Sequence, residues 1–259
     1  MDHYLFSVLQ KTPVSLALKE LIDSGLQDYY VIEDESCILI GGFLASTPKS
    51  LNFSIEKDSS FEIDWKDQAR LHCPYYKEGL IEVPLKDFGF PSDLTVKLYP
   101  GEGFGDLSHP TTQLMLHAMS RWIPKNAPVL DIGSGSGILS FAAHIGLSAK
   151  AQGLEIDPKA LDLSKRNSSL NGAPIDFSPR ISKEAFLDFS KGAILMNMIT
   201  SEQAQVFKAY DFTLFKGTLI VSGLLHSETA KYLSMLCLTS DNVLGKTFLD
   251  GWACLVIRK

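Results

Sequence analysis

The sequence predicts an α/β protein whose larger part is a mostly parallel sheet with helices on both faces, preceded by a smaller α+β domain. Two observations favour this fold. After about residue 93, short apolar runs alternate with helical patterns, which is typical of β-α-β units. Before that point, strand-like runs follow one another with one helix among them. Pro and Gly residues cluster between positions 86 and 101, so we expect domains at residues 1–92 and 93–259.

In the first domain, residues 13–25 predict a helix. Val14, Leu18 and Leu21 recur on one face, Pro13 lies near the start, and Gly25 is the expected stop. Runs rich in β-branched and aromatic residues predict strands at residues 5–10, 28–35, 36–44 and 50–58. This pattern indicates a helix packed on a small sheet.

In the second domain, helices are expected at residues 109–123, 136–147 and 158–172. Asp157 is the expected cap of the last of these and Gly172 its stop. Short apolar runs predict buried strands at residues 127–133, 151–157, 192–197, 216–224 and 252–259. Alternation of this kind indicates a parallel sheet with helices on both faces.

Composition restricts the function classes. The chain has 45% apolar and 21% charged residues, which excludes a disordered chain or a disulfide scaffold. The net charge of −6 disfavours direct nucleic-acid binding and favours a basic protein partner. No signal peptide or membrane span is expected, and the four cysteines are expected to be buried reduced thiols of a cytoplasmic protein, with no metal site. A monomer is favoured.

The strongest motif is the run from Val129 to Gly137, V-L-D-I-G-S-G-S-G, where a strand enters a glycine-rich turn and a helix follows. Such turns let the backbone approach a ligand at the carboxyl ends of parallel strands. A dinucleotide fingerprint would need a third glycine where Ile138 stands, which argues against a nicotinamide dehydrogenase. Asp131 would repel a pyrophosphate but would suit a sulfonium and an amino group. Glu155 is placed to accept hydrogen bonds from ribose hydroxyls.

Acid, glycines and acid at this spacing resemble the S-adenosylmethionine site of class I methyltransferases. Upstream, Gly103-Phe104-Gly105-Asp106-Leu107-Ser108-His109-Pro110-Thr111-Thr112 is similar to the F-G-x-x-x-H-P-T-T segment of the bacterial methyltransferases that modify ribosomal protein L11. Further matches in order are Asn171-Gly172, Asn197-Met198-Ile199, Ser222-Gly223-Leu224 and Trp252. The resemblance covers residues 100 to the end. It departs at Gly105-Asp106-Leu107-Ser108, where the family usually has Gly-Thr-Gly-Thr, and the first domain matches only around Trp65 and Cys73-Pro74-Tyr75.

The resemblance implies a Rossmann-like seven-stranded sheet, S-adenosyl-L-methionine as cofactor, and methyl transfer to amines of a basic ribosomal protein of the large subunit, ribosomal protein L11. The amines would be lysine side chains, with the N-terminal amine a further candidate, and the first domain would recruit the substrate. It implies cofactor contacts at Thr112, Asp131, Gly133, Gly135, Glu155 and Asn197, with Asn197 also orienting the amine. His109 is as readily a packed loop histidine as a direct participant, and the sequence shows no general base.

Two alternatives remain open. Class I enzymes that methylate nucleobases or glutamine amides carry Asn/Asp-Pro-Pro-Tyr where this chain has Asn197-Met198-Ile199-Thr200, so this chain lacks their aromatic platform. A class I methyltransferase acting on another protein, an RNA or a small molecule is the wider form of this alternative. The second is an inactive homologue that binds the cofactor and transfers nothing.

Overall fold

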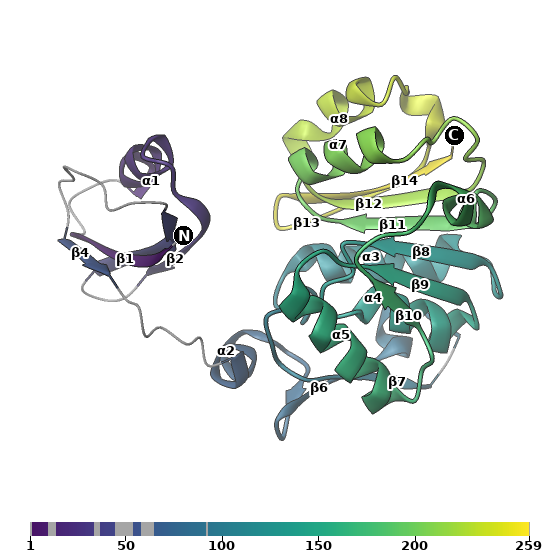
Figure 1. Cartoon of the computed structure of the whole chain (residues 1–259), viewed down its shortest axis with the longest axis horizontal. Helices are drawn as coiled ribbons and strands as arrows, with labels where there is room; N and C mark the ends of the chain where they lie inside the picture. Colours follow the sequence, from purple (N-terminus) through teal and green to yellow (C-terminus); the bar gives the residue numbers. More distant parts are fainter. Residues whose placement is uncertain are drawn as a thin grey trace. The chain divides into compact units, whose positions relative to one another are not determined.

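The computed structural model describes residues 2–9, 14–33, 37–44, 54–57, 65–91 and 93–258. The chain divides into two compact units, Met1–Ile63 and Asp64–Lys259 (Figure 1). Among the described residues, no helix has the length and apolar character needed to cross a membrane.

The first unit is a four-stranded antiparallel sheet with one helix. The strand order is β2-β3-β1-β4, from β1 (Asp2–Leu9), β2 (Gln27–Glu33), β3 (Cys37–Leu44) and β4 (Ser54–Lys57). Tyr4, Phe6 and Val8 alternate along β1 and are buried, as the two-residue period of a strand requires. They form one cluster with Ala17 and Leu21 of helix α1 (Val14–Asp23). The expected strands and helix are present in the described part of this unit.

The second unit contains a seven-stranded sheet of order β10-β9-β8-β11-β12-β14-β13. The first five strands are parallel to one another, and β14 pairs antiparallel with both β12 and β13, so β14 alone runs in the opposite direction. The strands are β8 (Pro128–Ile132), β9 (Lys150–Leu154), β10 (Asp176–Ser178), β11 (Ala193–Asn197), β12 (Thr218–Leu225), β13 (Val243–Leu249) and β14 (Trp252–Arg258). The chain runs outward through β8, β9 and β10 and then returns to β11 on the other side of β8. The strand order therefore reverses at β8 and β11, where ligands bind in open α/β sheets.

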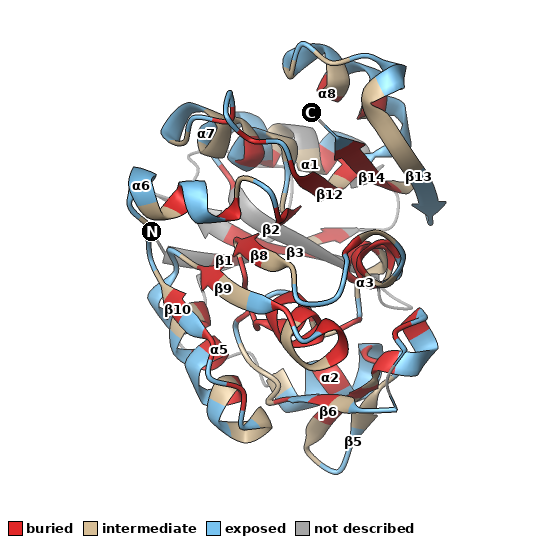
Figure 2. Cartoon of the chain, turned by 90° about the vertical axis from the view of Figure 1, so that its right-hand side faces the viewer, coloured by how far each residue is buried: buried red, intermediate tan, exposed pale blue. Residues whose placement is uncertain are grey.

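Successive residues of the central strands face opposite sides, so each strand contributes to two cores. Val129 and Leu195 pack into a core with helices α3 (Pro110–Trp122) and α4 (Ile138–Phe141), which continues as a π-helical turn over Ala142–Gly146. Leu130 and Ile194 face the other core, with α6 (Lys183–Phe186), α7 (Thr200–Ala209) and α8 (Thr229–Met235). Figure 1 shows α7 and α8 on one side of the sheet, and Figure 2 shows β8, β12, β14 and α3 mostly buried.

Helix α5 (Pro158–Asn171) begins and ends where the sequence predicts. Asp157 accepts a hydrogen bond from the Lys159 amide at 2.8 Å, and Gly172 ends the helix in the left-handed region. Several elements of this unit were not predicted from the sequence. They include β10, α6, α7 and α8, the mostly exposed strand β13, and a small antiparallel sheet of β5 (Tyr76–Lys77), β6 (Leu80–Pro84) and β7 (Thr95–Leu98).

The boundary between compact units lies at 63/64 and not at 92/93. Helix α2 (Trp65–His72), β6 and the turn Leu85–Phe88 bury Ala69, Val83, Leu85 and Phe88 in the same core as α3 and the large sheet. The Pro and Gly residues near position 90 therefore mark turns inside the second unit, and the segment 65–91 belongs to it.

The cysteines correct one expectation. Cys73 and Cys254 are free and buried, but Cys237 is exposed in the turn after α8. The side chain of Cys37 is not among those that the structure describes. Cys254 lies 3.8 Å from the sulfur of Met115, in the packed last strand.

Candidate active site at the strand ends

The six residues expected to hold a cofactor lie around the carboxyl ends of three neighbouring strands. Asp131 is in β8, Glu155 directly follows β9, and Asn197 ends β11. Gly133 and Gly135 form the turn between β8 and α4, and Thr112 is in the first turn of α3. The strand order β9-β8-β11 places Glu155 and Asn197 on the two sides of the glycine turn.

The glycine turn depends on residues without side chains at two positions. Gly133 and Gly135 have φ values of +73° and +53°. A Cβ at Gly133 would overlap Cε of Met198, and one at Gly135 would overlap the carbonyl oxygen of Phe104. At Gly135 the backbone contact and the left-handed conformation together require glycine, whereas at Gly133 the left-handed backbone favours glycine and the Met198 methyl could move aside.

The turn is covered by the loop that precedes α3. The Ser136 amide donates a hydrogen bond to the Phe104 carbonyl at 2.9 Å. A Cβ at Gly103 would lie only 2.7 Å from the Ser136 nitrogen, so the two backbones are in close contact. The sequence does not predict this direct contact between the two segments.

Glu155 is tied to the backbone on both sides. Its Oε2 accepts a hydrogen bond from the Gly135 amide at 2.9 Å, and its Oε1 accepts one from the Asp157 amide at 2.9 Å. A carboxylate oxygen has more than one acceptor site. Glu155 can therefore hold the glycine turn and still accept hydrogen bonds from a ligand.

Asp131 is completely buried behind the turn. Its Oδ2 accepts hydrogen bonds from the amide and hydroxyl of Ser140, at 3.1 and 2.7 Å. Burial raises the pKa of Asp131 from 3.8 to about 7, the Ser140 hydrogen bonds oppose this, and the charge of Glu155 adds to it. Ser140 was not expected from the sequence. An acid at a strand end and a hydroxyl in the helix that follows the turn are the signal that could have indicated it.

Thr112 and Asn197 lie next to each other. The Asn197 amide donates to the Thr112 hydroxyl at 3.4 Å, which joins the start of α3 to the end of β11. Both side chains are buried, at 0% and 8% exposure. This contact was not predicted, because the two residues are far apart in sequence.

His109 caps helix α3 and packs among aromatic rings. Its Nδ1 accepts a hydrogen bond from the Thr111 amide at 3.3 Å and lies 2.8 Å from the Thr111 hydroxyl. Its ring centroid lies 4.7 Å from that of Trp252 and 5.5 Å from that of Phe104. Burial lowers the pKa of His109, and the charge of Asp106 partly opposes this. The histidine therefore has a structural role at the start of α3, next to the turn that contains Thr112.

Four buried polar atoms have no hydrogen-bond partner among the described residues, and all four lie at this site. They are Asp131 Oδ1, Ser134 Oγ, Ser136 Oγ and Asn197 Oδ1. Buried polar groups in native proteins nearly always have partners, and a bound polar ligand is one way to supply them. The residues present therefore fit a ligand rich in hydrogen-bonding groups at the end of β8.

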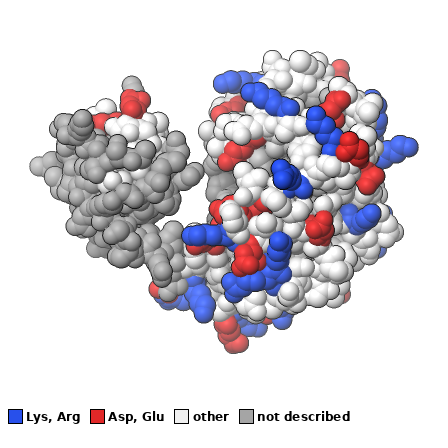
Figure 3. Space-filling view, viewed as in Figure 1, with Lys and Arg blue, Asp and Glu red and all other residues white. Residues whose placement is uncertain are grey.

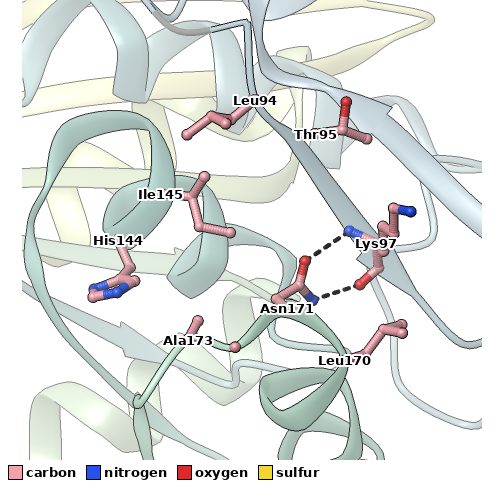
Figure 4. A pocket seen from close by; sticks show the side chains of 9 residues that line it. Leu94, Thr95, Lys97, His144, Ile145, Leu170, Asn171 and Ala173 are labelled. Carbon is pink, nitrogen blue, oxygen red and sulfur yellow. Dashed lines mark hydrogen bonds between the residues drawn. The ribbon is translucent and has the colours of Figure 1, made fainter.

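A pocket of about 380 Å³ lies elsewhere, near the amino ends of β9 and β10 (Figure 4). Asn171 joins the backbone amide and carbonyl of Lys97 there, at 2.9 and 2.6 Å. None of the six expected residues lines this pocket, so its position does not support a role in chemistry at the carboxyl ends of the strands.

Comparison with known proteins agrees with this geometry. Residues 26–259 match the family model described as ribosomal protein L11 methyltransferase (PrmA). The chain belongs to this family. Its relatives include a ribosomal protein L11 methyltransferase of Geobacter metallireducens, 32% identical over 76% of this chain and 67% of the relative. Another, of Prochlorococcus marinus, is 30% identical over 69% of this chain and 61% of the relative. The match thus spans about three fifths of the length of this second relative.

A solved structure supports the membership. The ribosomal protein L11 methylase of Lactobacillus delbrueckii subsp. bulgaricus superposes with a TM-score of 0.54 at 29% identity, over 66% of this chain and 89% of that chain. This chain has the α/β architecture with a seven-stranded, mostly parallel sheet that the sequence predicts.

The pKa of Asp131 leads to a prediction for the protein without cofactor. Because the folded pKa is raised, the folded state holds a proton that the unfolded state has lost between about pH 4 and pH 7. The free energy of unfolding therefore decreases over this window as the pH rises, by on the order of a few kcal/mol from this group. In Asp131→Asn, which keeps an oxygen for Ser140, this contribution disappears.

Thermal unfolding at pH 5 and pH 8 measures it. We expect the wild type to lose more stability than Asp131→Asn between the two pH values. The difference between the proteins isolates Asp131 from His109, whose lowered pKa acts in the opposite direction. Equal pH dependence of the unfolding temperature in the two proteins would contradict the raised pKa of Asp131.

Proposed function

We propose that this protein transfers methyl groups from S-adenosyl-L-methionine to lysine side chains of ribosomal protein L11, with the N-terminal amine as a second acceptor. The observation that carries the proposal is the group of unpartnered polar atoms at the end of β8, between Glu155 and Asn197. Family membership supports the substrate, because the relatives are named for methylation of this ribosomal protein. A ribosomal substrate also favours a cytoplasmic location.

The cofactor-binding roles follow from what each residue offers. The Thr112 hydroxyl lies in the first turn of α3, at the positive end of the helix dipole, and can hold a carboxylate. Gly133 and Gly135 leave room for the ligand along the turn. Glu155 offers acceptor positions to ribose hydroxyls, and Oδ1 of Asp131, which has no hydrogen-bond partner among the described residues, can accept a hydrogen bond from the ligand. When bound, S-adenosylmethionine supplies a methyl group on a sulfonium, a good leaving group.

In the proposed reaction this chain mainly orients an amine. The amine nitrogen forms a bond to the methyl carbon as the carbon–sulfur bond breaks. The unpartnered Oδ1 of Asn197 can accept an N–H of the amine, which directs its lone pair. A lysine amine has an ordinary pKa of about 10.4 and must lose its proton first, and burial favours the neutral form. Positioning of this kind can contribute a large part of a rate enhancement.

The surface supports a protein substrate more than a nucleic acid. On the face drawn in Figure 3, lysine and arginine side chains of the second unit are interspersed with aspartate and glutamate. With a net charge of −6, the chain has little long-range attraction for a phosphate backbone. Ribosomal proteins are basic, so the same charge favours their approach.

The test uses radiolabelled S-adenosylmethionine and purified ribosomal proteins of the large subunit, read by gel and mass spectrometry. We expect label on ribosomal protein L11, at lysine residues. A protein that binds the cofactor yet labels none of these proteins would be a binding module and would refute the transferase. Label on RNA alone would favour a nucleic-acid methyltransferase.

The two compact units give a further prediction. A chain that starts at Asp64 keeps the core around Ala69, Val83 and Leu85 and is expected to bind S-adenosylmethionine with unchanged affinity. It is expected not to methylate the protein substrate, because we assign recruitment to residues 1–63. Calorimetry and the labelling assay measure the two properties.

A chain that starts at Ser92 is the control. It lacks all three of these side chains, of which Val83 and Leu85 are each worth about 1.5–3 kcal/mol of burial, and it should unfold at a lower temperature. Full transfer activity in the chain starting at Asp64 would overturn the recruitment role of the first unit.

A further inference from the structure

Gln203 is a completely buried polar residue on the apolar side of α7. It precedes Val206, Phe207 and Tyr210 at helical spacing, and these three pack on the core between α7, α8 and the sheet. A glutamine at such a position has to satisfy two donors and an acceptor without water. Its contacts therefore show what the residue holds together.

All the polar groups of the Gln203 amide are used. Nε2 donates hydrogen bonds to the carbonyl oxygens of Met198 and Ser222, at 2.7 and 2.8 Å. Oε1 accepts a hydrogen bond from the hydroxyl of Tyr232 in α8. Tyr232 is itself buried, and burial raises its pKa, so the hydroxyl keeps its proton and remains a donor. One side chain thus joins the end of β11, the interior of β12 and a second helix.

The two carbonyls belong to the residues next to Asn197. Met198 follows Asn197 directly, and Ser222 is opposite Asn197 in the parallel pairing of β11 and β12. The Met198 backbone is packed so closely against Gly223 that a Cβ there would overlap its carbonyl. The Ser222 hydroxyl in turn donates to the Ala253 carbonyl in β14 at 2.8 Å. The carboxyl end of β11 is therefore held by α7, through Gln203, and by β12, through Ser222 and Gly223.

We propose that Gln203 is a positioning residue, which holds the Met198 and Ser222 carbonyls so that the Asn197 side chain points at the ligand and the amine. This rests on the proposed function, in which Asn197 orients the acceptor. Asn197 itself has one partner at 3.4 Å and an unpartnered Oδ1, so its own side-chain contacts restrain it weakly. The restraint comes from the backbone on its carboxyl side, which Gln203 holds.

The substitution that tests this is Gln203→Met, since methionine has nearly the length of glutamine but neither donates nor accepts these hydrogen bonds. We expect turnover to fall on the order of tenfold. A displacement of ~1 Å in a reacting group can cost about a hundredfold in rate, and we expect Asn197 to move by less than that. We expect the KM for the protein substrate to stay unchanged, since recruitment is assigned to the other unit.

A double-mutant cycle separates positioning from stability. If Gln203 acts through Asn197, Gln203→Met has no further effect on turnover in an Asn197→Ala background, whereas its effect on thermal unfolding persists there. Tyr232→Phe removes only the hydrogen bond to Oε1 and should give a smaller loss of turnover than Gln203→Met. Ile257→Val is the matched stability control. Ile257 lies in the same core as Tyr232, but it pairs with Leu219 near the amino end of β12, away from the site. It should lower the unfolding temperature and leave turnover unchanged.

Wild-type turnover in Gln203→Met, or an equal loss of turnover with and without Asn197, would overturn the proposal. If the wild type transfers no methyl group at all, the proposed function has failed instead. The same cycle is then measured on the affinity for S-adenosylmethionine by calorimetry, where Asn197 is also expected to contribute. Additive losses of affinity would overturn the positioning role.

Discussion

Asn197→Ala is expected to reduce methyl transfer about a hundredfold while the protein stays folded. Asn197 ends β11 at the point where the strand order reverses, and its Oδ1 has no partner in the described structure. Without this side chain the amine is no longer directed at the methyl group, and a displacement of about 1 Å can cost on the order of a hundredfold in rate.

The rate is measured with saturating labelled cofactor and ribosomal protein L11. Thermal stability should fall only slightly, since the one side-chain hydrogen bond of Asn197 among the described residues is the 3.4 Å bond to Thr112. Asn171→Ala is the matched control, because it removes the same amide from the pocket near the amino ends of the strands (Figure 4). Asn171→Ala should keep its rate. Undiminished turnover in Asn197→Ala would show that this asparagine is structural.

Glu155→Ala is expected to weaken the binding of S-adenosylmethionine about tenfold to a hundredfold. Hydrogen bonds to a charged group are worth on the order of 1.5–3 kcal/mol, and each 1.4 kcal/mol is a factor of ten in affinity. The substitution removes the expected ribose contacts and also frees the Gly135 amide, so the glycine turn is held less firmly. Both effects act in the same direction.

Calorimetry measures the affinity, with two variants for comparison. Glu155→Gln keeps one oxygen but presents an NH2 group to one of the two backbone amides, so its affinity should lie between those of wild type and Glu155→Ala. Asp176→Ala removes an exposed acid on β10, where it bonds only to Gln152 among the contacts described. Its affinity should not change. Wild-type affinity in Glu155→Ala would show that this acid does not bind the cofactor.

Many strands and helices of the second unit could be predicted, because the residues that specify each of them are neighbours in the sequence. The buried parallel strands are continuous apolar runs, and Asp157 and Gly172 mark the two ends of α5. Strand β13 was missed because its residues are mostly exposed and carry no apolar alternation. The domain boundary was misplaced because Pro and Gly mark turns in general, and only packing shows that residues 65–91 join the larger core.

The residues expected at the site could be named, but their partners could not. The glycines and acids lie in one short motif and at the end of the next strand, so spacing indicates them. Ser140 and Gln203 contribute through contacts with residues distant in sequence, and only the folded chain brings them together. The spacing of Val206, Phe207 and Tyr210 places Gln203 on the apolar face of α7, but no local pattern shows which groups its amide binds.

The contact between the glycine turn and the loop before α3 has a consequence for engineering this fold. The Ser136 amide bonds to Phe104, and Gly103 and Gly135 lie against the facing backbone. Neither segment can be lengthened, shortened or exchanged alone without breaking this match. To build this ligand-binding site on another sheet, residues 101–112 and residues 131–140 would have to be transferred together as one unit.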